Sequence, residues 1–227
     1  MIKAVIFDLD NTLLDFIKMK ERAVAGAVDS MIEAGLEVDA KEAFDEIINL
    51  YETRGWENQV VFNDFLIEQI GKVDYKFLAA GIVAYRRARE ASLMLYPNVQ
   101  KTLVTLVKMG VKLAVISDAP SREAWLRIYS LNLHQFFDLV LTFDDIQERK
   151  PSSKGFEMIL DRLFLNSVEV LMVGDWPERD VVGASKLGIR TIFARYGDTF
   201  GTIESGADWD INNIYEIVGI VKNLNGS

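Results

Sequence analysis

The chain has 227 residues, enough for one large domain or for one domain that carries an insertion. Half of the residues are hydrophobic, which excludes a disordered chain, and the absence of cysteine excludes disulfides, thiolate metal sites and cysteine nucleophiles. The 34 acidic and 25 basic residues give a net charge of −9, which disfavours a broad nucleic-acid surface but allows a local pocket for a small phosphorylated ligand.

The sequence also predicts a cytoplasmic protein that does not act at a membrane. Its longest uninterrupted apolar stretch, Phe77–Tyr85, is much shorter than the roughly 20 residues that a transmembrane helix needs. Asp8 and Asp10 lie within the first apolar segment, where a secretory signal would be uncharged. We therefore expect neither a membrane nor a nucleic acid as a partner.

Five short apolar runs predict buried parallel strands. They lack polar alternation, as is typical of strands that helices cover on both faces. The predicted strands are Ala4–Phe7, Leu113–Ile116, Leu139–Leu141, Val170–Val173 and Thr191–Phe193. Helical segments are predicted between the later runs, over Val99–Met109, after Pro120, over Gly155–Phe164 and over Val181–Leu187. This alternation predicts an α/β fold with a doubly wound, mostly parallel, Rossmann-like sheet.

The segment between the first two predicted strands shows helical periodicity alone. Its apolar stripes predict four helices from about Phe16 to about Leu93, whereas a simple crossover usually carries one. We predict an inserted α-helical domain over residues 16–92 and an α/β core domain formed by residues 1–15 and 93–227. Four aromatic residues of this inserted domain are expected mostly in its core, namely Phe16, Tyr51, Trp56 and Phe62.

Polar side chains follow four of the predicted strands. Because ligands bind at the carboxyl ends of the strands in an open α/β sheet, we expect these side chains to share one edge. Acidic groups without soft ligands suit a hard cation, most simply Mg²⁺, and a lysine with a hydroxyl suits an anion beside it. Asp8 and Asp10 taken alone fit a solvated turn equally well. The full set is Asp8, Asp10, Ser117, Asp118, Lys150, Asp175 and Asp180.

These residues resemble the four ordered motifs of the haloacid dehalogenase-like hydrolase superfamily, and the helical insertion resembles its cap. The motifs are Asp8-Leu9-Asp10-Asn11-Thr12, Ser117, Lys150-Pro151 and Gly174-Asp175-Trp176-Pro177-Glu178-Arg179-Asp180. The resemblance implies a phosphoric monoester hydrolase that acts on a small phosphorylated metabolite through an aspartyl-phosphate. It also implies a cap that closes over a small substrate and excludes water.

The resemblance assigns the chemistry to two carboxylates. Asp8 would be the nucleophile, and Asp10 would protonate the leaving alcohol and then deprotonate the attacking water. The Mg²⁺ ligands would be Asp8, Asp175 and the backbone carbonyl of Asp10.

The remaining motif residues would hold the phosphoryl group or support its ligands. The side chains of Ser117 and Lys150, with the backbone N–H groups of Leu9 and Asp118, would bind the phosphoryl oxygens. Thr12 would orient Asp10 or tighten the turn. Asp180 would act at the metal through water or hold Lys150, with the N-cap of the next helix as the alternative.

Three other functions stay open. A sugar phosphomutase shares the motifs but retains the phosphoryl group. A 2-haloacid dehalogenase uses an aspartate nucleophile but needs neither a second carboxylate nor a metal, so Asp10 and Asp175 argue against it. A non-enzymatic phospho-accepting signalling domain has a similar acidic cluster, but such a domain is much smaller and carries its acceptor on a middle strand.

Overall fold

The computed structural model describes residues 1–226 and divides into two compact units. The core unit is Met1–Asp15 with Met94–Ser227, and the cap unit is Phe16–Leu93. The chain thus leaves the core after the loop that follows the first strand and returns to it before the second strand.

The core unit contains a six-stranded parallel sheet in the order β3-β2-β1-β4-β5-β6. This order places β1 between β2 and β4, as in a doubly wound Rossmann-like sheet, and it confirms the predicted fold class. The strands are β1 (Ala4–Phe7), β2 (Lys112–Ile116), β3 (Leu139–Leu141), β4 (Val170–Gly174), β5 (Arg190–Ala194) and β6 (Trp209–Ile211).

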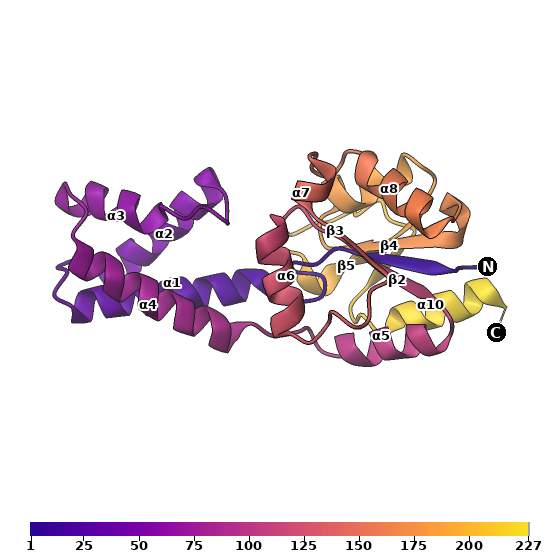
Figure 1. Cartoon of the computed structure of the whole chain (residues 1–227), viewed down its shortest axis with the longest axis horizontal. Coiled ribbons are helices and arrows are strands. Elements are labelled where there is room, and N and C mark those ends of the chain that lie inside the picture. The colour runs from indigo at the N-terminus through magenta and orange to yellow at the C-terminus, as the bar shows by residue number, and fades with distance from the viewer. Residues whose placement is uncertain (227) are drawn as a thin grey trace. The chain divides into compact units, whose positions relative to one another are not determined.

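Helices cover both faces of the sheet because the central strands are buried on both sides. Phe156 and Ile159 pack with Ile6 and Met172 in one buried cluster on the first face. Helices α5 and α10 lie side by side on the other face (Figure 1). The core helices are α5 (Val99–Lys108), α6 (Ser121–Ser130), α7 (Phe143–Ile146), α8 (Lys154–Leu163), α9 (Val182–Ser185) and α10 (Glu216–Asn225). Short 3₁₀ and π turns join them, η1 (Ser167–Glu169), η2 (Pro177–Val181) and η3 (Arg195–Gly197).

All five predicted strands are present, with small differences in length. Gly110 and Gly188, which follow two predicted helices, adopt the left-handed conformation expected of a helix cap. The structure adds β6 and α10, which the sequence analysis did not predict. It also replaces the predicted start of the Val181–Leu187 helix by the π turn η2, so the regular helix α9 begins at Val182.

The cap unit consists of four helices around its own apolar core. They are α1 (Phe16–Glu33), α2 (Ala40–Arg54), α3 (Val61–Ile70) and α4 (Tyr75–Ser92). Of the four aromatic residues expected in this core, Phe16, Tyr51 and Phe62 are buried and Trp56 is partly buried. The Lys20 ammonium lies over the ring of Tyr51 at 4.4 Å from its centroid.

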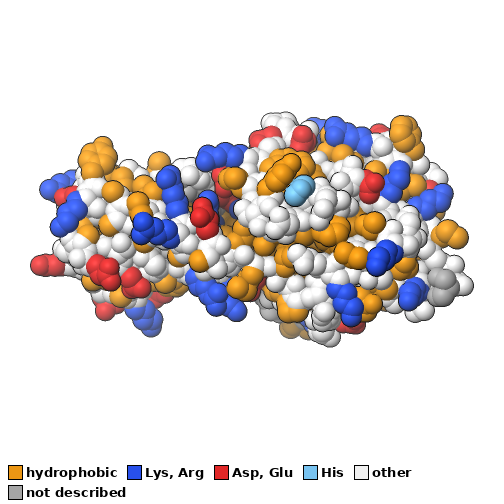
Figure 2. Space-filling view, turned by 60° about the horizontal axis from the view of Figure 1, so that its bottom comes forward, with side chains coloured by type: hydrophobic (Ala, Val, Ile, Leu, Met, Phe, Trp, Pro, Cys, Tyr) orange, Lys and Arg blue, Asp and Glu red, His pale blue; other side chains and the backbone are white. Residues whose placement is uncertain are grey.

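The chain's single histidine lies at the surface of the core unit. Figure 2 shows it in pale blue beside hydrophobic side chains. Its ring stacks on Tyr129 at a centroid distance of 4.5 Å, and His134 lies in a turn. Among the described residues, none of the helices combines the length and the apolar character that crossing a membrane requires.

Candidate active site

The parallel register of the sheet brings the ends of three strands together. Strand β1 pairs with β4 so that Phe7 faces Val173, and the backbone N–H of Asp8 donates to the Val173 carbonyl at 2.9 Å. Asp175 directly follows β4, and Ser117 directly follows β2 on the other side of β1. Residues from distant parts of the sequence therefore meet at the carboxyl edge of the sheet.

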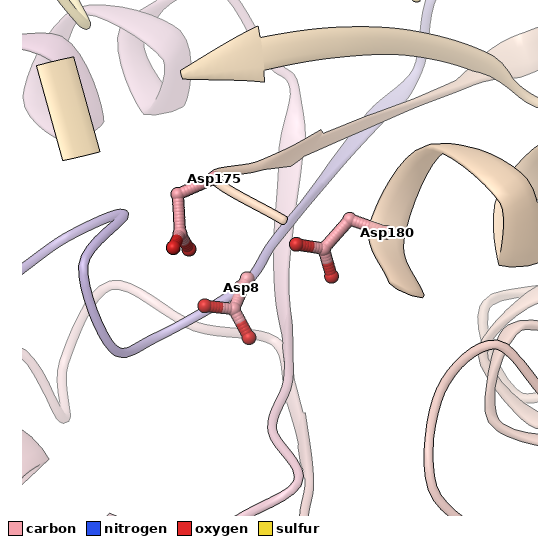
Figure 3. Close-up of side chains that lie close together, drawn as sticks. All are labelled: Asp8, Asp175 and Asp180. Carbon is pink, nitrogen blue, oxygen red and sulfur yellow. The ribbon is translucent and has the colours of Figure 1, made fainter. Parts of the chain in front are cut away.

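Three aspartates converge at this edge. One carboxylate oxygen from each of Asp8, Asp175 and Asp180 lies within 4.8 Å of the others, and all three side chains are buried (Figure 3). Burial raises the pKa of Asp8 to about 7, although Lys150 opposes the shift. Burial, with repulsion from Asp8 and Asp180, raises the pKa of Asp175 well above its ordinary value. The cluster favours a further positive charge, and its oxygen donors suit Mg²⁺.

Lys150 supplies the cationic side chain of this cluster. Its Nζ donates to Asp8 Oδ1 at 2.5 Å and to Asp180 Oδ1 at 2.6 Å, and the side chain is buried. Burial alone would lower the pKa of Lys150, but the carboxylates of Asp180, Asp8 and Asp118 raise it above its ordinary value. The ammonium therefore stays charged beside the candidate nucleophile.

Asp180 is held in this arrangement at both of its carboxylate oxygens. Its second oxygen accepts from the backbone N–H of Trp176 at 3.1 Å, so both oxygens of Asp180 accept hydrogen bonds. The alternative role as an N-cap is wrong, because the N-cap of α9 is Val181, and this cap has no side-chain hydrogen bond. A Cβ at Gly174 would lie 2.2 Å from Asp180 Oδ2, so the end of β4 must be glycine for Asp180 to take this position.

Thr12 and Asp118 each hold a neighbouring motif. The sequence predicted that Thr12 orients Asp10 or tightens the turn, but its hydroxyl donates to Asp175 Oδ1 at 2.9 Å and so orients Asp175. Asp118 accepts from the backbone N–H of Lys150 and from Arg179 Nη1, both at 3.0 Å. Sequence reasoning expected a backbone role for Asp118, and the structure adds this side-chain link between two motifs. The Arg179 guanidinium in turn lies over the Trp176 ring, which accounts for the bulky residue in the fourth motif.

Other expected site residues lie at the same edge of the sheet. Ser117 is buried, and its Oγ accepts from the backbone N–H of Ala119 at 3.2 Å. Leu9 is fully buried and follows the end of β1, next to Asp8.

The structure also adds Arg127, a partner for Asp10 that sequence reasoning missed. Arg127 Nη1 donates to Asp10 Oδ2 at 2.7 Å, and the Arg127 side chain is only 7% exposed. The feature that could have pointed to Arg127 is its position on α6, between Ala124 and Ile128, which are both fully buried. An arginine on the buried stripe of a helix requires a partner.

The loop after β1 is held from the opposite end of the chain. Asn11 has a left-handed backbone with φ of 58°, which turns the chain sharply after Asp10. The Tyr196 hydroxyl donates to the Thr12 carbonyl at 2.8 Å. Burial, helped by the carboxylate of Asp175, raises the pKa of Tyr196 and keeps this hydroxyl protonated as a donor. Sequence reasoning missed Tyr196 as well, because no motif contains it.

Comparisons with known proteins agree with this geometry. The family model of haloacid dehalogenase-like hydrolases matches residues 5–194. The chain is 36% identical over 227 residues to the glyceraldehyde 3-phosphate phosphatase of Methanocaldococcus jannaschii, covering 99% of both chains. It is 32% identical to the Pyrococcus abyssi protein of the same name, covering 100% of this chain and 97% of that one. It also resembles the solved structure of a HAD phosphatase from Thermococcus onnurineus, with 26% identity, a TM-score of 0.71, and 97% and 98% of the two chains covered.

Proposed function

The chain belongs to the haloacid dehalogenase-like hydrolase family, and on that premise we propose that it is a Mg²⁺-dependent phosphatase of glyceraldehyde 3-phosphate or a similarly small phosphate ester. The observation that carries the chemistry is the buried cluster in which Lys150 bridges Asp8 and Asp180 beside Asp175. The proposed substrate is supported by two relatives, matched over nearly their whole length, that carry the name glyceraldehyde 3-phosphate phosphatase.

The proposed reaction runs in two steps on the chain's own carboxylates. A carboxylate oxygen of Asp8 attacks phosphorus, the bond to the leaving oxygen breaks, and Asp10 gives that oxygen its proton. Water then attacks the aspartyl-phosphate, its proton passes to Asp10, and the bond between phosphorus and Asp8 breaks to release phosphate.

The remaining residues bind and orient the reacting groups. The carboxylates of Asp8 and Asp175, with the backbone carbonyl of Asp10, are the proposed Mg²⁺ ligands, and the bound ion would offset charge on the phosphoryl oxygens. Lys150 and Ser117, with the backbone N–H groups of Leu9 and Asp118, hold those oxygens in our proposal. The hydrogen bond from Thr12 to Asp175 supports this ligand assignment.

A substrate panel tests the proposal directly. We expect Mg²⁺-supported phosphate release with the highest kcat/KM on glyceraldehyde 3-phosphate, compared with phosphoglycolate, sugar phosphates and nucleoside monophosphates. EDTA should stop the release, and excess Mg²⁺ should restore it. A rearranged sugar phosphate without free phosphate would instead support a phosphomutase. EDTA-insensitive halide release from a 2-haloacid would support a dehalogenase, for which Asp10 and Asp175 would have no use.

As the pH rises, we expect the stability of the metal-free protein to fall and the increase in Tm caused by Mg²⁺ to grow. The pKa of Asp8 is about 7 in the folded protein against an ordinary value of 3.8, so the folded state binds the extra proton between these values. The metal-free protein should therefore lose stability as the pH rises from about 4 to about 7. Mg²⁺ binds the ionised carboxylates, so the increase in Tm that it causes should grow over the same window.

Thermal unfolding in EDTA and in Mg²⁺ across this pH range measures both effects. Asp175→Asn removes a proposed ligand and should remove most of the Mg²⁺-dependent increase in Tm. Asp161→Asn changes an exposed aspartate of α8 and is the matched control. An increase in Tm that is the same in Asp175→Asn and in the wild type would contradict the ligand assignment.

A further inference from the structure

The two carboxylates of the first motif pair with different cations. Lys150 contacts Asp8 and Asp180, whereas Arg127 donates to Asp10 Oδ2 at 2.7 Å. Lys150 belongs to a recognised motif, but Arg127 lies outside all four motifs. It reaches Asp10 across 117 positions of sequence.

The position of Arg127 is fixed by the helix that carries it. Arg127 lies in the last turn of α6, and its neighbours Ala124 and Ile128 on the same face are fully buried. A guanidinium that is delivered from a packed helix has few alternative positions. A buried arginine is also strongly destabilising unless a carboxylate pairs with it, so the contact with Asp10 is not a loose surface ion pair.

The cation at Asp10 also lies close to other acidic groups of the site. The Asp10 side chain is 23% exposed, and its charge adds to the repulsion that raises the pKa of Asp8. The same repulsion acts on the Asp10 carboxylate in return. Arg127 supplies an attraction that acts on the Asp10 carboxylate itself.

We propose that Arg127 is a positioning residue that holds the Asp10 carboxylate in place for proton transfer to the leaving oxygen. This inference rests on the proposed phosphatase activity. Because the guanidinium lies at Oδ2, the proton that Asp10 transfers is carried by the other oxygen, Oδ1. As this proton moves to the leaving oxygen and the bond between that oxygen and phosphorus breaks, Arg127 stabilises the carboxylate that remains on Asp10.

The leaving group provides a test that a purely structural role would not pass. An alkyl phosphate such as glyceraldehyde 3-phosphate needs its leaving oxygen protonated, whereas the leaving group of p-nitrophenyl phosphate departs without an acid. The ratio kcat/KM covers the steps up to departure of the leaving group. We expect Arg127→Ala to lower kcat/KM by about tenfold to a hundredfold for glyceraldehyde 3-phosphate and by about threefold at most for p-nitrophenyl phosphate.

Two further variants separate positioning from damage to the fold. Arg122→Ala removes an exposed arginine of the same helix and should leave both ratios unchanged. Arg127→Lys keeps the charge but loses the planar fork, so its loss should be intermediate with the same bias towards the alkyl ester. If Arg127→Ala does not fold, as judged by its thermal unfolding, Arg127→Lys decides the question with the same two substrates.

A double-mutant cycle shows whether Arg127 acts through Asp10. In an Asp10→Asn background, Arg127→Ala should cause no further loss of kcat/KM on glyceraldehyde 3-phosphate. Equal losses on the two substrates, or an additive loss in the Asp10→Asn background, would overturn the inference. A wild-type enzyme that releases phosphate from neither ester would overturn the proposed function, and the inference with it. The wild-type control distinguishes these two failures.

Discussion

Asp8→Asn is expected to abolish phosphate release, with a loss of about 10⁴-fold or more in kcat on glyceraldehyde 3-phosphate. An amide has no anionic oxygen to attack phosphorus. The other two carboxylates of the cluster are held by other contacts, Asp175 by Thr12 and Asp180 by Lys150 and a backbone N–H. Steady-state phosphate release at saturating Mg²⁺ measures the effect. Mass spectrometry of the acid-quenched wild-type enzyme should also show a phosphoryl group on the peptide that contains Asp8, and this group should be absent from the variant.

The fold should survive this substitution. Asp8 is a buried carboxylate whose pKa is raised to about 7, so removing its charge relieves repulsion within the acidic cluster, and Lys150 keeps its contact with Asp180. We expect the Tm of the metal-free variant to stay close to that of the wild type. Asp161→Asn, on the exposed face of α8, is the control for loss of a carboxylate in the same unit. Wild-type turnover by Asp8→Asn would mean that the nucleophile lies elsewhere.

The strands that the sequence predicted are those whose burial is visible in a few consecutive residues. Ala4–Phe7 and Val170–Val173 are apolar and buried along their whole length, so each can be recognised from its own residues alone. Strand β6, Trp209–Ile211, lies at the edge of the sheet and has an exposed aspartate in the middle, so no apolar run marks it. The order of the strands was beyond prediction from this one sequence, because pairing joins segments far apart in the chain.

The same distinction between local patterns and long-range contacts applies to the residues of the candidate site. The motif residues were found because each directly follows a strand or lies in a recognisable short pattern. Arg127 and Tyr196 lie outside these patterns, and their hydrogen bonds to Asp10 and to the Thr12 carbonyl join positions more than a hundred residues apart. Asp118 is a third case: the sequence predicted it as a site residue but did not predict the hydrogen bond that its side chain accepts from Arg179.

A segment far away in the sequence packs against the loop after β1 that carries Asp8 and Asp10, here called the nucleophile loop. A substitution in that segment should have the second large effect on activity. We expect Gly197→Ala to lower kcat/KM by about a hundredfold or more and to destabilise the protein by about 2 kcal/mol or more. A Cβ at this position would lie 1.7 Å from the backbone carbonyl oxygen of Asn11 and 3.2 Å from Asp175 Cβ. The clash is with backbone, which cannot rotate away as a side chain can, so either η3 or the loop that carries Asp8 and Asp10 must move.

A second glycine of the core unit makes a matched control. Gly219 lies on the exposed side of α10, and a Cβ there meets nothing within 4 Å. Gly219→Ala should therefore keep full activity and stabilise the protein by about 0.5–1 kcal/mol, because alanine is the better helix residue. Urea unfolding and kcat/KM, measured on both variants, separate the effect of a methyl group in general from its effect beside Asn11. Equal activity of Gly197→Ala and Gly219→Ala would contradict this prediction. It would mean that the nucleophile loop can move further than its hydrogen bonds to Asp175 and Tyr196 allow, and that η3 does not hold the loop.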